Sequence, residues 1–187
     1  KRLKQIDVEC SEQIDRFGLI FHAAELQRQP TEANLARTDL ESILRSLEPG
    51  WREQLKRREI SLSLDLDRGL PTVMSDSHRL EAMLGGLIDR SSRGLPGGSE
   101  LQLGLQAAGA RVKLQLHVVL PGSATSSANA SPAREELGTV LSWDPTTGSL
   151  QLSQDATRQM MASLGGRYQP RRDRDLTVFF PVHSDAD

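Results

Sequence analysis

The side chains best suited to chemistry are two arginines, Arg90 and Arg93, near the end of a predicted helix. The apolar residues of segment 79–93 recur every three or four positions, and residues three apart lie on nearly the same face of a helix. Guanidinium groups donate hydrogen bonds and never accept them, so this pair suits a phosphate, a sulfate or a carboxylate and cannot ligate a metal ion. The alternative is that both arginines point into solvent or pair with acidic residues of the chain, namely Glu81, Asp89 or Asp173.

The other reactive side chains lack the spacing that catalysis or metal binding requires. We find no Ser/His/Asp signature, and Cys10 has neither a second cysteine nor a histidine nearby. The histidines are scattered without metal-ligand spacing: His22, His78, His117 and His183. A basic run predicts a solvated hairpin tip, with contact to a partner as the alternative; it comprises Arg167, Arg171, Arg172 and Arg174, mixed with Asp173 and Asp175.

The composition excludes several classes of function. With a formal net charge of −2 over 187 residues and 4% aromatic side chains, the chain lacks the charge and the stacking surface expected of a nucleic-acid-binding protein. Its single cysteine excludes an internal disulfide and fits a reducing compartment. There is no apolar run long enough to span a bilayer and no secretory leader, so the expected location is cytoplasmic.

Residues 1–28 predict one long helix with an apolar stripe. The members of the stripe alternate by three and four, as in a coiled-coil seam: Leu3, Ile6, Cys10, Gln13, Phe17, Ile20 and Ala24. Such a stripe needs a partner, which we expect to be a helix of another chain or a preceding helix. Packing on its own domain is the alternative.

Helices and strands follow one another in the rest of the chain. A helix over 38–58 is predicted to begin at Thr38 or Asp39, and Pro49-Gly50 to kink or interrupt it. Strict apolar alternation then predicts a half-buried strand over 60–66.

The next predicted helix, 77–93, takes Asp76 or Ser77 as its N-cap and stops at Pro96-Gly97-Gly98. A hairpin follows, with strands 101–105 and 112–118 joined at Ala108-Gly109, and then a mobile loop or lid over 121–136. A short strand or turn is predicted over 140–143. The last elements are a helix capped by Ser153 and ended by Gly165-Gly166, and a strand over 176–181. This order predicts an α+β sandwich, with one mixed sheet and its helices on one face.

The order and its anchors resemble the ATP-binding domain of sensor histidine kinases, the histidine kinase-like ATPase (GHKL) family. Four stretches carry the resemblance: 1–28, similar to the second helix of the dimerisation hairpin; 60–93, with a strand, a D-x-x-R-L turn (Asp76, Arg79, Leu80) and the nucleotide-contacting helix; 97–118, the following hairpin; and 147–169, a Gly-rich turn, a helix and Gly-Gly. The resemblance implies a two-layer α/β sandwich of the Bergerat type, with a dimerisation helix over 1–30. The ATPase domain would then cover 31–187, with a lid-like loop at about 120–146.

The nucleotide motifs of that family are degraded here. Gly86 and Arg90 stand where the family has two asparagines in an N-x-x-x-N spacing, the second of which ligates Mg²⁺. Val118 replaces the aspartate that reads adenine, and Leu120 replaces the first glycine of the same motif. The remaining site positions are Arg93, a basic residue able to meet a phosphate, Gly122, and Gly148 in the reduced glycine turn Gly148-Ser149-Leu150-Gln151-Leu152.

These substitutions predict a pseudokinase or regulatory module of two-component signalling, with no cofactor and no catalytic residue. One alternative is an active histidine kinase core with divergent ligands, which would use ATP and Mg²⁺. Another is sensing of a nucleotide or anion without catalysis. The expected partners are a second copy through the 1–28 helix and a response regulator or another kinase, and no nucleic acid.

Overall fold

The computed structural model describes residues 34–122, 135–137, 141–144, 149–170 and 175–183. The chain divides into two compact units, one formed by Lys1–Glu32 and Pro132–Met160, the other by Ala33–Ser131 and Met161–Asp187. We describe each unit by itself. The predicted helix over 1–28, Gly148 and most of the loop over 121–136 lie outside the described residues.

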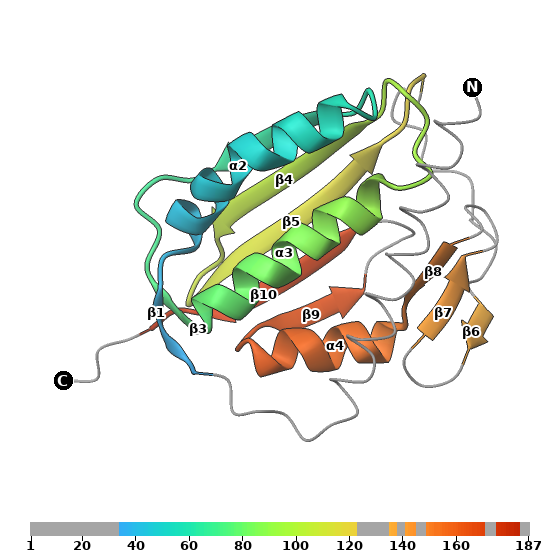
Figure 1. The fold of residues 1–187 in the computed structure, drawn as a ribbon. Coiled ribbons are helices and arrows are strands. Elements are labelled where there is room, and N and C mark those ends of the chain that lie inside the picture. Colours follow the sequence, from blue (N-terminus) through green and yellow to red (C-terminus); the bar gives the residue numbers. More distant parts are fainter. Residues whose placement is uncertain (1–33, 123–134, 138–140, 145–148, 171–174, 184–187) are drawn as a thin grey trace. The chain divides into compact units, whose positions relative to one another are not determined.

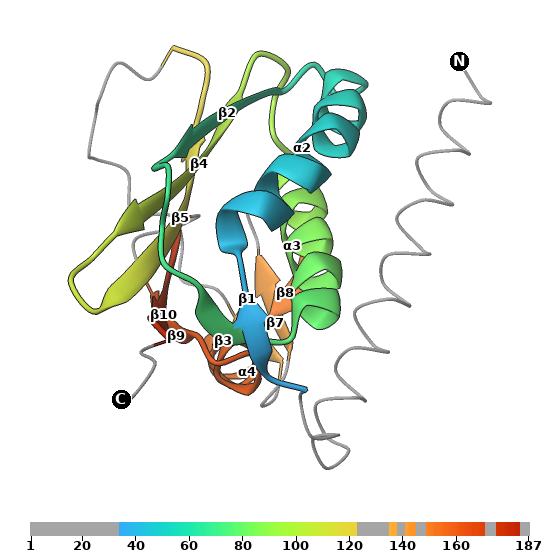
Figure 2. The same cartoon turned by 90° about the vertical axis from the view of Figure 1, so that its left-hand side faces the viewer.

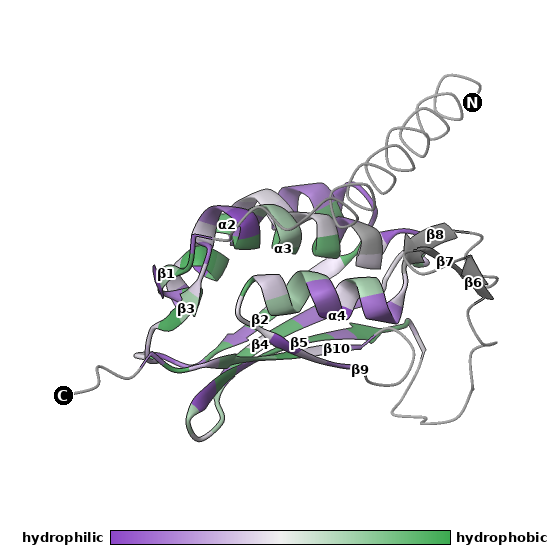
Figure 3. Ribbon diagram, turned by 90° about the horizontal axis from the view of Figure 1, so that it is seen from below, coloured by the Kyte–Doolittle hydropathy of each residue, from purple (hydrophilic) through white to green (hydrophobic). Residues whose placement is uncertain are grey.

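The second unit is built on a five-stranded sheet with the order β2-β4-β5-β10-β9 (Figure 1). The strands are β2 (Ser61–Leu66), β4 (Glu100–Ala107), β5 (Arg111–Val119), β9 (Arg167–Pro170) and β10 (Leu176–Pro181). β2 and β4 run parallel, and all other neighbours run antiparallel. Two helices, α2 (Leu40–Lys56) and α3 (Ser77–Ser92), form a layer on one face of the sheet (Figures 1 and 3). The predicted mixed sheet with helices on one face is confirmed.

The core lies between this sheet and the two helices, and alternation along the strands places it there. Every second residue of the central strands is apolar and buried: Leu101, Leu103 and Leu105 in β4, Val112, Leu114 and Leu116 in β5, and Leu176, Val178 and Phe180 in β10. The helices contribute Leu44 and Leu55 from α2 and Leu80, Leu84 and Ile88 from α3. The predicted hairpin is confirmed, and it turns at Gly109, whose φ of +64° favours glycine.

Helix α2 continues through Pro49, so of the two predicted effects of Pro49-Gly50 the interruption is wrong and the kink stays a prediction. It begins at the predicted N-cap: the Asp39 carboxylate accepts a hydrogen bond from the Ser42 N–H at 3.1 Å. Pro49 removes the N–H that would reach the carbonyl of Arg45, one turn back. Pro49, Gly50 and Arg45 are all exposed, so water can satisfy that carbonyl and the helix tolerates the proline.

Two three-residue strands, β1 (Ala36–Thr38) and β3 (Val73–Ser75), pair antiparallel with each other (Figure 2). Neither was predicted, because three residues are too few to show a period. Side-chain hydrogen bonds fix them: Thr38 Oγ1 donates to the Ser75 carbonyl at 3.0 Å, and Ser75 Oγ donates to the Leu164 carbonyl at 2.7 Å. Both side chains are buried, so these bonds satisfy groups that water does not reach.

The Gly165-Gly166 pair follows α4 (Gln154–Ser163), as predicted, and packs very tightly. Gly165 has φ of +79°, and a Cβ there would come 2.4 Å from the carbonyl oxygen of Met74 in β3. A Cβ on Gly166 would come 2.8 Å from Val178 and 2.9 Å from Phe180, both in β10. Glycine is therefore needed at both positions for space, and at Gly165 also for its backbone conformation.

The described part of the first unit is a three-stranded antiparallel sheet and the start of α4. Its strands are β6 (Glu135–Leu137), β7 (Leu141–Asp144) and β8 (Ser149–Leu152), in the order β6-β7-β8. β7 confirms the strand alternative for 140–143, and β6 and β7 lie within the stretch expected as a lid-like loop. Ser153 caps α4 as predicted, because its Oγ accepts from the Ala156 N–H at 3.1 Å.

The reduced glycine turn is likewise a strand, which corrects the expectation of a turn. Residues 149–152 pair with β7, Leu150 opposite Trp143 and Leu152 opposite Leu141. The stretch contains no glycine and alternates polar with apolar residues, which suits a paired strand better than a loop.

Among the helices that the structure describes, none is long and apolar enough to cross a membrane.

Candidate functional site

Helix α3 carries two of the predicted site residues, Gly86 and Arg90, and ends just before a third, Arg93; Asp76 sets its start. The Asp76 carboxylate accepts hydrogen bonds from the N–H groups of Arg79 at 3.1 Å and Asn34 at 3.2 Å. Its main-chain carbonyl accepts from the Leu80 N–H at 2.8 Å, and Arg79 Nε lies 3.7 Å from its Oδ2. The N–H of Arg79 is the main cause that lowers the pKa of Asp76 below its usual value, because it stabilises the charged carboxylate. Asp76 is thus the N-cap, as predicted.

Helix α3 also carries Gly86 and, near its end, Arg90, the two positions at which the family has asparagines. Both belong to the helix, one turn apart. Gly86 is half-buried and has no side chain that could bind a ligand. The side chain of Arg90 lies outside the described part of the chain, so its predicted role stays a prediction.

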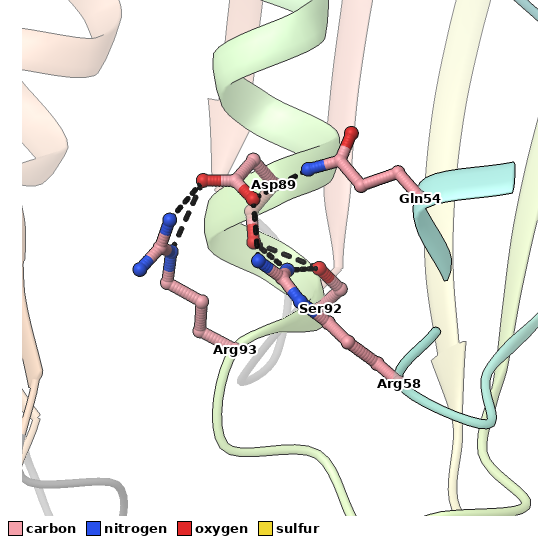
Figure 4. A network of polar contacts seen from close by, with 5 residues as sticks. All are labelled: Gln54, Arg58, Asp89, Ser92 and Arg93. Carbon is pink, nitrogen blue, oxygen red and sulfur yellow. Dashed lines mark hydrogen bonds and ion pairs between the residues drawn. The ribbon is translucent and has the colours of Figure 1, made fainter. Parts of the chain in front are cut away.

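Arg93, just beyond the end of α3, pairs with Asp89 one turn back (Figure 4). Its Nε and Nη2 donate to the same Asp89 oxygen, Oδ2, at 3.1 Å and 2.5 Å. Both side chains are only 22% exposed. For Arg93, the alternative of pairing with an acidic residue of the chain is confirmed.

The other oxygen of Asp89 accepts hydrogen bonds from α2 and from the turn that follows it. Arg58 Nη2 donates to Asp89 Oδ1 at 2.8 Å, and Gln54 Nε2 donates to the same oxygen at 2.6 Å (Figure 4). Arg58 Nη1 also donates to the main-chain carbonyl of Asp89 at 3.2 Å and to Ser92 Oγ. One carboxylate therefore lies between two guanidinium groups and joins the ends of the two helices.

The cluster of Gln54, Arg58, Asp89, Ser92 and Arg93, here the Asp89 cluster, was only partly visible in the sequence. The i, i+4 spacing of Asp89 and Arg93 is a readable signal for a pair on one helix. Arg58 and Gln54 are 31 and 35 residues away from Asp89, and no local pattern links them. Sequence reasoning missed both.

Val118 lies near the end of β5 and belongs to the apolar face of the sheet. It is opposite Leu101 in β4 and follows the alternation of Leu114 and Leu116. The side chain is half-buried and contains no oxygen that could accept a hydrogen bond from an adenine amino group. The strand ends at Val119, the exposed Leu120 comes next, and Gly122 follows with φ of +80°.

The described positions do not form the ligand set that ATP and Mg²⁺ need in the expected motifs. Gly86 offers no donor or acceptor from a side chain, Val118 offers none either, and Arg93 is paired with Asp89. Mg²⁺ requires oxygen ligands, which none of these side chains supplies. Within the described residues there is also no group of three or more His, Cys, Asp or Glu side chains that could hold a metal ion.

Comparison with known proteins places this fold in a class. No family model matches the sequence. Among solved structures, the histidine kinase AdeS of Acinetobacter baumannii superposes with a TM-score of 0.59 at 18% identity, covering 98% of this chain and 82% of that one. Histidine kinase ThkA, solved in complex with response regulator protein TrrA, gives a TM-score of 0.64 at 12% identity, covering 96% of this chain and 50% of the other. The fold is therefore the α+β fold of histidine kinase catalytic domains.

The sequence itself supports a closer relationship. It is 37% identical over 186 residues to the sensor histidine kinase Hik34 of Synechocystis sp., a match that covers 96% of this chain and 39% of that protein. Together with the fold, this match identifies a histidine kinase-like ATPase (GHKL) domain of the two-component signalling type. The chain spans about two fifths of the length of the kinase that it matches.

Proposed function

We propose that this domain works in two-component signalling through protein contacts, as a pseudokinase or regulatory module, without ATP-dependent phosphotransfer. The observation that carries the proposal is the set of side chains at the expected nucleotide positions. The side-chain positions of Gly86, Arg90 and Val118 offer no acceptor atom for Mg²⁺ or for the adenine amino group. The pairing of Arg93 with Asp89 supports it further, because that guanidinium already has an anionic partner within the chain.

A calorimetric titration with ATP, with and without Mg²⁺, tests this function. We expect no Mg²⁺-dependent binding and no self-labelling with radioactive ATP, either by this chain or by the longer protein that contains it. Self-phosphorylation that requires Mg²⁺ would contradict the proposal and favour the active kinase core with divergent ligands. Saturable, salt-sensitive binding of inorganic phosphate that is lost in Arg90→Ala would instead indicate an anion site at Arg90.

The partners are part of the proposal. ThkA was solved with a response regulator, and the same kind of partner, or another kinase, fits a module that acts by contact. We also propose that residues 1–28 pair with a second copy. Full burial of Phe17 or Ile20 is worth roughly 1.5–3 kcal/mol per side chain, which favours a helical partner over water.

The dimer is tested by replacing two residues of the stripe. The double variant Phe17→Asp, Ile20→Asp is expected to be a monomer by light scattering, with an unchanged circular dichroism melting curve for the rest of the chain. Pairing of the two helices would bury the aspartate carboxylates in the seam without an opposite charge to compensate them. This burial costs more free energy than the seam provides, so association is lost. A parent protein that is already monomeric at high concentration would contradict the dimer.

A further inference from the structure

The sheet of the second unit has a second face, opposite α2 and α3, and most of its residues are polar. In Figure 3 the two helices lie on one side of this sheet, and no described element of the unit lies on the other side. Since side chains alternate along a strand, the residues between the buried ones belong to this open face. They form rows across the strands, fixed by the register of β5, β10 and β9.

One row places an aromatic ring between two cations. Phe179 in β10 is opposite Lys113 in β5 and also opposite Arg167 in β9. Phe179 and Lys113 are half-buried and Arg167 is exposed. Directly opposed residues have Cβ atoms about 5 Å apart, so the side chains of Lys113 and Arg167 both start beside that of Phe179. We call these three residues the Phe179 row.

The neighbouring rows add amides and one more cation. Gln115, Thr177 and Gln169 form the next row, with Gln115 Nε2 3.4 Å from Thr177 Oγ1. On the other side, Arg111 lies opposite Pro181 and is exposed. The row after the amides holds His117, whose Nδ1 is 2.9 Å from Oδ2 of Asp175.

The charges of the open face are divided between its two halves. The sequences of β5, β9 and β10 contain no acidic residue, and Asp175, just before β10, is paired with His117. The acidic residues are on the β2 and β4 side, where Asp67 accepts from the Ala107 N–H at 3.2 Å and Glu100 from Gln102 Nε2 at 3.2 Å. The half that contains the Phe179 row is therefore positive.

We propose that the Phe179 row, with Arg111 and the two glutamines beside it, docks an acidic polypeptide segment of a partner protein. An apolar side chain of the segment would lie on the ring of Phe179, and carboxylates on either side of it would meet Lys113 and Arg167. Gln115 and Gln169 carry both donors and acceptors, which match peptide groups. This surface goes beyond the proposed function, which does not say where a partner binds.

The same features favour a polypeptide over other anionic partners. Nucleic acid requires a denser basic surface and usually several stacking aromatics, whereas this half has one ring and three cations, and the chain has a net charge of −2. A membrane surface likewise attracts clusters of four or more cations. A short acidic segment needs only a few charge pairs and one apolar contact.

The experiment measures binding of a short peptide of alternating glutamate and leucine by fluorescence anisotropy, using the full chain. We expect weak, saturable binding that falls with added salt and that drops about tenfold in the variant Lys113→Glu, Arg167→Glu, because attraction becomes repulsion at two charge pairs. The matched control is Lys56→Glu, Arg57→Glu at the exposed end of α2, on the other side of the sheet, which should bind as the parent does. Circular dichroism verifies that both variants are folded.

Several outcomes would overturn the docking surface. The first is no saturable binding, and the second is equal binding of a control peptide of the same length that alternates lysine with leucine. The third is an equal loss of binding in the α2 control variant. The fourth is tighter binding of a thymidine oligonucleotide or of phosphatidylserine vesicles that depends on Lys113 and Arg167. Self-association that is lost in Lys113→Glu, Arg167→Glu while the peptide does not bind would assign the face to a second copy and contradict the proposal. No nucleotide is present, so failure here and failure of the proposed function are separate results.

Discussion

Replacing Gly165 by alanine is expected to lower the free energy of unfolding by about 3 kcal/mol. Gly165 has φ of +79°, and an added Cβ would lie 2.4 Å from the carbonyl oxygen of Met74. The left-handed conformation costs a non-glycine residue about 1–2 kcal/mol, and the contact with a main-chain atom of β3 adds strain of about 1–3 kcal/mol. Chemical denaturation with urea measures the difference.

Gly50→Ala is the matched control for this substitution. Gly50 lies inside α2, is exposed, and has no atom within 4 Å of an added Cβ. Alanine there should leave stability unchanged or raise it by up to about 1 kcal/mol, because alanine favours helix more than glycine does. If Gly165→Ala and Gly50→Ala unfold at the same urea concentration, the close contact between Gly165 and β3 does not exist in solution.

The tight contact at Gly165 also shows what local sequence reasoning can and cannot find. Gly165-Gly166 is recognisable as a helix stop, but its packing against Met74 depends on β3, a strand of three residues without a period. The bond from Ser75 Oγ to the Leu164 carbonyl joins residues 89 positions apart. In contrast, apolar alternation predicted β4 and β5 correctly, because one face of each is buried.

Proline gave a misleading local signal in α2. A proline inside a helix removes one main-chain hydrogen bond, so Pro49 indicated a kink or an interruption. Whether the helix breaks depends on whether water can satisfy the carbonyl that loses its partner, which is a tertiary property. Asp39 was readable because an N-cap bonds to its own first turn, here to Ser42.

The candidate site was predictable in its residue types more than in its contacts. Gly86 and Val118 lie on α3 and on the apolar face of β5, as the resemblance implies. The i, i+4 spacing of Asp89 and Arg93 indicated their pair, whereas Arg58 comes from the turn after α2 and its contribution requires the fold. Long side chains from distant segments have no period to reveal them.

The Asp89 cluster leads to the second prediction with a large effect. Asp89→Ala is expected to lower the free energy of unfolding by about 2 kcal/mol, because three side chains lose their hydrogen-bond acceptor and two guanidinium groups are left close together. Arg58 and Arg93 are 30% and 22% exposed, so water replaces the lost carboxylate only in part. Asp89→Asn keeps one acceptor oxygen and should show an intermediate loss in the same urea titration.

A double-mutant cycle separates the charge pair from the rest of the cluster. If Asp89 and Arg93 stabilise each other, the variant Asp89→Ala, Arg93→Ala loses less stability than the two single variants added together, by about 1 kcal/mol. Glu53→Ala is the control on α2, since the Glu53 carboxylate is 3.7 Å from Arg57 and both side chains are more than half exposed, which makes that pair nearly neutral in energy. Strict additivity in the cycle, or a loss in Glu53→Ala equal to that in Asp89→Ala, would mean that Arg93 is not held by Asp89. That result would also return Arg93 to the candidates for binding an external anion, because its guanidinium would then lack the carboxylate partner that the structure gives it.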